Sequence, residues 1–161
     1  MADLFAAPLQ AKIALVTLFL ALAISVVTDL RRRLILNAVT MPALAVIAVC
    51  IVWLGGFTLL AEAALGVLVC AGPLALAMLK NAMGAGDVKL MALSGAVAGA
   101  AAGWPFALTI LLYVSVAGGV QAVAWIVAAK VRGQDRPKYV PYGLSIAVGT
   151  IAAFLWGGAL L

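Results

Sequence analysis

Two aspartates lie at the ends of long apolar runs and could carry out chemistry together. Asp29 closes the first apolar run in "SVVTDLRRR", and Asp87 precedes another in "NAMGAGDVKL". Two carboxylates that share a site cannot easily both ionise, so one keeps its proton while the other acts as a base. Such a pair can activate water against a peptide carbonyl, because one carboxylate accepts the water proton and the other polarises the carbonyl oxygen. The two residues predict an aspartyl hydrolase if the fold brings them together.

The composition narrows the other catalytic options. The chain of 161 residues contains no histidine, which excludes Ser-His and Cys-His catalysis, HExxH zinc sites and haem held by histidine. Cys50 and Cys70 each lie inside an apolar run and form no CxxC pair, so we interpret them as small apolar side chains. We expect no metal and no cofactor. A pairing of Ser94 with Lys89 is disfavoured, because helical residues five apart do not face each other.

Each aspartate also has a purely structural interpretation. Asp87, ahead of "VKLMAL", would cap a helix N-terminus, and Asp29 would pair with the arginines that follow it. Gly84 and Gly86 allow unusual backbone angles and the close approach of another chain, so we interpret them as room for an extended substrate segment. Lys89 would either bias the ionisation of Asp87 or extend to lipid headgroups. Taken together, the two aspartates and the glycines favour a function.

The other three acidic residues are expected to play no catalytic part. Asp3 is in the polar N-terminal tail, and Asp135 lies among basic residues in a polar link. Both are interpreted as solvated charges. Glu62 lies one turn inside the end of an apolar run, where a structural or packing role is expected.

The composition predicts that membrane-spanning helices position the two aspartates. Hydrophobic residues make up 68% of the chain and charged residues 9%, whereas about a quarter of the residues in soluble domains are charged. The repeated apolar runs are long enough to cross a bilayer as helices. We predict an all-α, polytopic membrane helical bundle that forms a single domain over residues 1–161. About six transmembrane helices are expected, at 10–28, 38–54, 58–79, 88–102, 104–130 and 140–160.

The basic residues predict the orientation of this bundle. All of them except Lys12 fall in or beside the links that follow the first, third and fifth spans. By the positive-inside rule these links are cytoplasmic, so both termini face outside and the two aspartates lie at the cytoplasmic edge. The net charge of +5 then reflects topology, with membrane lipid as a partner, and we expect no nucleic acid. The residues in these links are Arg31, Arg32, Arg33, Lys80, Lys89, Lys130, Arg132, Arg136 and Lys138.

Three stretches resemble one family of membrane proteases. "GAGDVKL" matches the G-x-G-D motif of polytopic aspartyl proteases and, in its "GDxKL" form, resembles the type IV prepilin peptidases. "TDLRRRLILN" is similar to that family's other aspartate motif, in which a basic residue and Ile-Pro-Asn follow the Asp. Here the proline is replaced by Leu36, between Ile35 and Asn37, which affects the expected shape of the link more than the catalytic assignment. "KYVPYGLSIAVG" resembles the family's last-helix pattern, and the whole resemblance implies that Asp29 and Asp87 form the catalytic dyad.

The resemblance also implies a substrate and a location. Family members remove the short basic leader of pilin-like precursors, typically after a glycine, at the cytoplasmic side of the inner membrane. Larger members also carry an insert with CxxC pairs and methylate the new N-terminus. This chain has neither feature and resembles the short, peptidase-only form of Flp (tight-adherence) pili, with archaeal preflagellin peptidases as the alternative. We expect the substrate-binding residues to be Gly84, Gly86, Lys89 and Asn37, and the prepilin or pseudopilin precursor to be the partner.

Two other functions compete with hydrolysis. A small proton- or cation-coupled transporter would use the aspartates as its ion site, although transporter sites usually lie near the bilayer midplane. A non-catalytic membrane component of pilus assembly would need neither aspartate.

A glycine repeat predicts close helix packing. Gly95, Gly99 and Gly103 recur at four-residue spacing, and small residues at this spacing let helices approach closely. We expect this face to pack within the chain, with a homodimer as the alternative.

Overall fold

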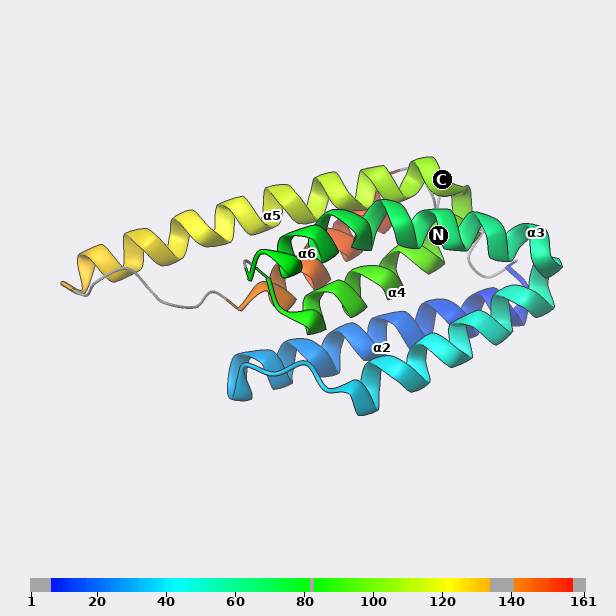
Figure 1. Cartoon of the computed structure of the whole chain (residues 1–161), viewed down its shortest axis with the longest axis horizontal. Coiled ribbons are helices and arrows are strands. Elements are labelled where there is room, and N and C mark those ends of the chain that lie inside the picture. Colours follow the sequence, from blue (N-terminus) through cyan, green and yellow to red (C-terminus); the bar gives the residue numbers. More distant parts are fainter. Residues whose placement is uncertain (1–6, 82, 134–140, 158–161) are drawn as a thin grey trace.

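The computed structural model describes residues 7–81, 83–133 and 141–157, and every regular element within them is a helix. The helices lie side by side in an elongated bundle (Figure 1). The predicted all-α class is therefore confirmed for the described part of the chain. The elements are α2 (Leu9–Arg32), α3 (Asn37–Leu79), α4 (Ala85–Ala102), α5 (Trp104–Val131) and α6 (Tyr142–Trp156).

Helix α3 contains two of the predicted spans, 38–54 and 58–79, within its 43 residues. Its backbone departs from helical geometry at Gly55 (φ −148°, ψ 15°) and Gly56 (φ 62°, ψ −149°). The positive φ of Gly56 is a conformation that glycine adopts at little cost. Figure 1 shows the chain reversing direction within α3, at the right-hand end of the bundle. Helix α3 is thus a pair of antiparallel arms, the first beside α2 and the second beside α4.

Three helices of the described residues are long and apolar enough to cross a membrane, by length and composition alone: α2, α3 and α5. Helix α6 is a shorter apolar helix, and the 18 residues of α4 include both Asp87 and Lys89. The described residues therefore support an apolar helical bundle with three candidate membrane spans. They do not establish the six transmembrane helices predicted from the sequence.

Some sequence predictions fall on residues that the structure does not describe. They concern the outward-facing termini, the solvated positions of Asp3 and Asp135, the cationic link residues Arg136 and Lys138, and the last part of span 140–160. These lie outside the described residues.

Glycines bring α3 and α4 into backbone contact. A Cβ atom added to Gly66 would lie 2.2 Å from the carbonyl oxygen of Gly95, and one on Gly99 would lie 2.2 Å from that of Glu62. Distances this short leave no space for any side chain at these positions. The glycine repeat thus packs within the chain, and α3 covers the surface on which the homodimer alternative was based.

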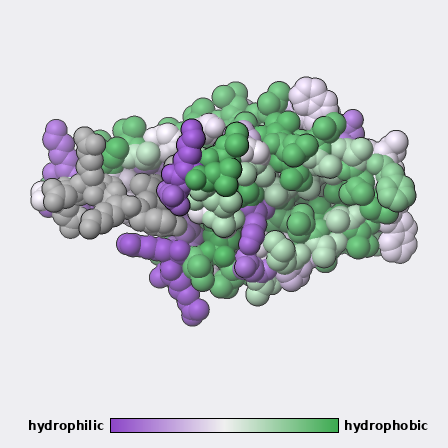
Figure 2. Space-filling model, viewed as in Figure 1, coloured by the Kyte–Doolittle hydropathy of each residue, from purple (hydrophilic) through white to green (hydrophobic). Residues whose placement is uncertain are grey.

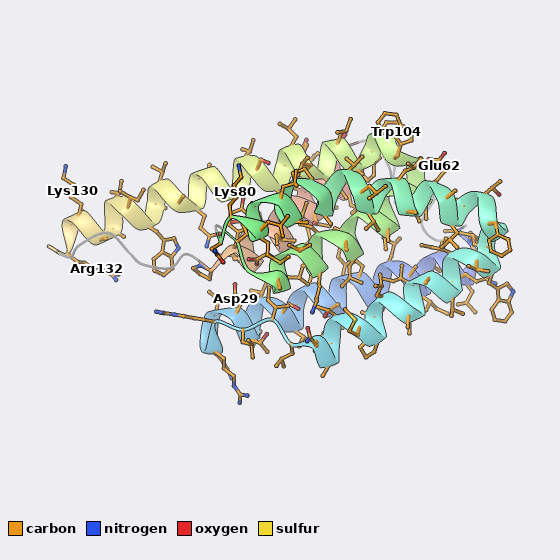
Figure 3. All side chains as sticks on the ribbon, viewed as in Figure 1. Asp29, Glu62, Lys80, Trp104, Lys130 and Arg132 are labelled. Carbon is orange, nitrogen blue, oxygen red and sulfur yellow. The ribbon has the colours of Figure 1, made fainter. Side chains whose placement is uncertain are left out.

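Glu62 has a structural role at the end of the bundle opposite Asp29 (Figure 3). Its carboxylate Oε2 accepts a hydrogen bond from the backbone N–H of Trp104 across 3.1 Å. Trp104 is the first residue of α5, whose first N–H groups lack partners within the helix. Glu62 therefore caps α5.

Charged side chains gather at the other end of the bundle. The last turn of α2 carries two arginines, Lys80 follows α3, and Lys130 and Arg132 lie at the end of α5. Figure 3 shows Asp29 towards this end, with all three of these labelled cations. Much of the hydrophilic surface visible in Figure 2 lies here too, while hydrophobic residues cover most of the rest of that face. Asp29 is therefore near the basic end of an otherwise apolar bundle.

Candidate active site

Asp29, in the last turn of α2, is buried and hydrogen-bonded. Its exposed fraction is 1%, and its Oδ2 accepts a hydrogen bond from the backbone N–H of Gly143 across 3.0 Å. Gly143 is in the first turn of α6, where a backbone N–H has no partner within the helix. Both this hydrogen bond and the helix dipole favour a carboxylate at that position. A Cβ atom on Gly143 would lie only 2.9 Å from the same oxygen, so glycine allows this close approach.

Asp87 is in the first turn of α4 and is also largely buried, with an exposed fraction of 7%. The helix begins at Ala85 after the N-cap residue Gly84, so the predicted N-cap position of Asp87 is wrong by three residues. The backbone N–H of Gly84 donates to Oδ2 of Asp87 across 3.3 Å. In return, the N–H of Asp87 donates to the carbonyl oxygen of Gly84 across 3.2 Å. Asp87 thus closes the first turn of its helix from the third helical position.

The two aspartates line one cleft with a volume of about 310 Å³. Its walls come from the end of α2, the link that follows it, the first residue of α3 and the first turns of α4. All six site residues expected from the sequence are brought together here. The lining residues are Asp29, Arg33, Leu34, Ile35, Asn37, Gly84, Ala85, Gly86, Asp87 and Lys89.

The carboxyl groups of the two aspartates interact electrostatically. Asp87 precedes the apolar part of α4 and lies outside the three candidate spans. Burial raises the pKa of Asp87 from 3.8 to about 6; the hydrogen bond from Gly84 opposes this rise, and the negative charge of Asp29 adds to it. Asp87 therefore keeps its proton at a higher pH than an ordinary aspartate does, and it does so beside a second carboxyl group.

Lys89 and Asn37 form a contact between two walls of the cleft. The Nζ of Lys89, in α4, donates to Oδ1 of Asn37, the first residue of α3, across 2.6 Å. The sequence analysis expected Lys89 either to extend to lipid headgroups or to bias the ionisation of Asp87. It did not predict a hydrogen bond to Asn37. The contact places a cation and an amide together beside the aspartates.

The two glycines of the G-x-G-D stretch have different surroundings. A Cβ atom on Gly86 would lie 2.6 Å from the Cβ of Ile35, so the link after α2 packs against Gly86. The space interpreted as room for a substrate is filled here by Ile35. Gly84 is exposed and has an extended backbone (φ −79°, ψ 147°). Substrate contact at either glycine stays a prediction.

Two residues that hold the site lie outside both aspartate motifs. Gly143 belongs to a stretch that matches the family's last-helix pattern, but nothing in that pattern indicates a contact with Asp29. Gln121, in α5, contacts the first turn of α6. One feature of the sequence could have pointed to Gln121. It is the single amide side chain of a largely apolar helix, where a polar side chain needs hydrogen-bond partners.

The structure thus combines an apolar helical bundle with two buried carboxyl groups that line one cleft near its basic end. Residues 16–123, which include both aspartates, match the type IV leader peptidase family. The chain belongs to this family, and the resemblance noted in its motifs is confirmed.

Two curated relatives share part of this chain. The prepilin leader peptidase/N-methyltransferase of Xanthomonas campestris pv. campestris is 35% identical over 82 residues, which cover 51% of this chain and 26% of the relative. The protein of the same name from Legionella pneumophila is 32% identical over 82 residues, with the same coverage of both chains. The match thus spans about a quarter of the length of each relative. No solved structure matches this chain.

Proposed function

We propose that this protein is a membrane aspartyl endopeptidase that removes the short basic leader of type IV prepilins or pseudopilins. The observation that carries the proposal is the pair of buried carboxylates, Asp29 and Asp87, which come from different helices and line one cleft. Family membership supports the class of reaction, because the two curated relatives are named as prepilin leader peptidases.

In the proposed reaction, Asp29 is the base and Asp87 is the acid. Oδ2 of Asp29 accepts the hydrogen bond of the Gly143 N–H, which suits an acceptor of protons, while burial favours a proton on Asp87. A water molecule between them gives a proton to Asp29 as its oxygen bonds to the carbonyl carbon. Asp87 donates its proton towards the carbonyl oxygen and stabilises the negative charge that develops there.

Collapse of the tetrahedral intermediate completes the cleavage. The C–N bond breaks, the carbonyl oxygen returns its proton to Asp87, and the amine leaves with the proton that Asp29 accepted. The products are a leader with a new carboxyl terminus and a shortened precursor with a new amino terminus. Both aspartates return to their starting states, so one water molecule is consumed in each cycle.

The rim of the cleft supports a proposed substrate path. We assign Lys89 and Asn37 to binding of the precursor backbone, because their joined polar groups lie beside the aspartates. Gly84, which is exposed, is assigned to the extended segment around the scissile bond, together with Gly86 two residues further on, where Ile35 would have to move aside. An Flp-type precursor is the proposed substrate, on the strength of the resemblance to short, peptidase-only members.

The proposed membrane arrangement has six crossings. The two arms of α3 cross separately, together with α2, α4, α5 and α6, and both termini lie outside. The basic residues at the Asp29 end support a cytoplasmic location for the cleft. We propose the inner membrane as the location, with multiple passes, and, from the resemblance to peptidase-only members, peptide hydrolysis as the activity.

The proposal is tested by a processing assay in membranes that contain an Flp-type precursor. Asp29→Asn and Asp87→Asn should each abolish cleavage while insertion continues, and Ser115→Ala, on the exposed surface of α5, should cleave normally. Mass spectrometry should find an unmethylated new N-terminus. Cleavage by either aspartate variant would contradict the dyad. Normal processing by both would indicate a non-catalytic component, and proton-dependent uptake into vesicles without cleavage would indicate a transporter.

A further inference from the structure

Gln121 is the one amide side chain of α5, and both ends of that amide contact the start of α6. Its Nε2 donates to the carbonyl oxygen of Pro141 across 2.8 Å. Its Oε1 accepts a short hydrogen bond from the hydroxyl of Ser145. Pro141 is the N-cap residue of α6, and Ser145 lies one turn further along. One side chain therefore ties both ends of the first turn of α6 to α5.

That turn also carries the hydrogen-bond donor to Asp29. Gly143 lies midway between Pro141 and Ser145, and its N–H points to the Asp29 carboxylate. The turn is thus held from two sides, by Gln121 of α5 and by Asp29 of α2. A shift of the turn would change the distance and angle of the Gly143 hydrogen bond.

The contact between α5 and α6 leaves the turn little freedom to shift by itself. A Cβ atom on Gly118 would lie 2.4 Å from the hydroxyl oxygen of Tyr142. Further along α6, in the same interface, a Cβ atom on Gly149 would lie 2.5 Å from the Cα of Val114. Close packing therefore sets the distance between α5 and α6. The two hydrogen bonds of the Gln121 side chain set how the first turn of α6 is rotated and where it lies along α5.

An apolar side chain would satisfy the packing at position 121 without the cost of placing an amide in an apolar helix. The two hydrogen bonds of the amide both go to the turn that orients Asp29. We propose that Gln121 is a positioning residue, which holds residues 141–145 so that the Gly143 N–H keeps the Asp29 carboxyl group oriented for hydrolysis. This inference rests on the proposed peptidase function.

The titratable and charged groups around the cleft come from three helices. Asp87 and Lys89 lie in α4, Arg33 follows Asp29 at the end of α2, and Tyr142 of α6 interacts electrostatically with Asp87. Gln121 is uncharged, so replacing it by another neutral side chain adds no charge to this set. A change in kcat of such a variant would therefore report an altered position of the turn and not an altered charge.

The test compares Gln121→Met, which has a similar length and no hydrogen bonds, with Ser115→Ala on the same helix. The full-length protein is assayed in lipid nanodiscs with an Flp-type precursor. Gln121→Met should lower kcat by about 10- to 100-fold, since small misplacements of catalytic groups cost about this much. KM should change by less than about two-fold. This split between kcat and KM marks a positioning role, because the turn orients Asp29 and does not contact the substrate.

A second variant separates positioning from folding. Ser145→Ala removes one of the two contacts, so it should show a smaller loss of kcat with KM again nearly unchanged. The double variant should lose less than the product of the two single losses, because both changes act through one turn. Should Gln121→Met fail to fold, the kcat and KM of Ser145→Ala decide the test.

Several outcomes would overturn the inference. They are an unchanged kcat in folded Gln121→Met, a change in KM alone, or a lower yield of folded protein with normal kcat per folded molecule. A different result would contradict the proposed peptidase function itself, namely cleavage of the precursor by Asp29→Asn. An inactive Asp29→Asn beside a normal Gln121→Met would contradict only the role given to Gln121.

Discussion

The backbone N–H of Gly143 donates to Oδ2 of Asp29 across 3.0 Å and joins the first turn of α6 to the last turn of α2. The contact is buried, and it supplies a hydrogen-bond donor to a carboxyl group that is itself 1% exposed. Asp29 therefore depends on the last described helix of the chain for its orientation.

Replacing Gly143 by alanine should reduce cleavage strongly. Its new Cβ atom would lie 2.9 Å from the Asp29 oxygen, so the turn or the carboxylate must move. We expect kcat to fall by about 10- to 100-fold, measured in the processing assay with folded protein. Gly119→Ala is the matched control, because a Cβ atom there meets nothing within 4 Å. Equal activities of the two variants would show that this contact does not orient Asp29.

The pH dependence of kcat/KM should report the Asp87 proton. Burial raises the pKa of Asp87 to about 6, so the protonated acid is present below that pH and is lost as the pH rises through it. We expect kcat/KM, which reflects the free enzyme, to decrease on its alkaline side with a midpoint near pH 6. A profile that stays flat between about pH 5 and 8 would rule out this role for Asp87.

Lys89→Met should weaken binding of the precursor more than it slows the chemistry. The variant loses the cation that the proposal assigns to the precursor backbone, and a hydrogen bond to a charged group contributes about 1.5 kcal/mol or more. KM should rise about tenfold, with a much smaller change in kcat. Lys80→Met, an exposed lysine outside the cleft lining, is the control. A loss confined to kcat, with a shifted pH profile, would instead mean that Lys89 acts on the dyad.

Glu62→Ala should lower stability without affecting catalysis. It removes the acceptor for the Trp104 N–H at the start of α5, and losing a helix cap costs about 1 kcal/mol. Thermal unfolding should shift down by about 2–4 °C, while kcat stays unchanged because Glu62 is at the opposite end of the bundle from Asp29. Glu62→Gln keeps an oxygen acceptor and should recover most of the loss. A fall in kcat would contradict the structural role of Glu62.

Local sequence patterns indicated much of the fold and the main candidate site residues. Apolar runs mark where helices form, and the two aspartate motifs supplied all six predicted residues that line the cleft. The helix start at Ala85 was missed because the cap is the backbone of Gly84, so the capping rule placed the boundary at Asp87. The roles of Gly143 and Gln121 depend on contacts between helices distant in the sequence, and no local pattern encodes such contacts. For the same reason, Ile35 packing against Gly86 was not foreseen.

The reversal at Gly55 and Gly56 decides which ends of the helices meet. A straight helix of 43 residues would be about 65 Å long, roughly twice the thickness of a bilayer core. It would carry Asn37 and Lys80 to opposite ends of the molecule, and Asp29 and Asp87 with them. Two glycines without reactive groups therefore set the parity of the chain: in the proposed membrane arrangement, an even number of passes separates the aspartates.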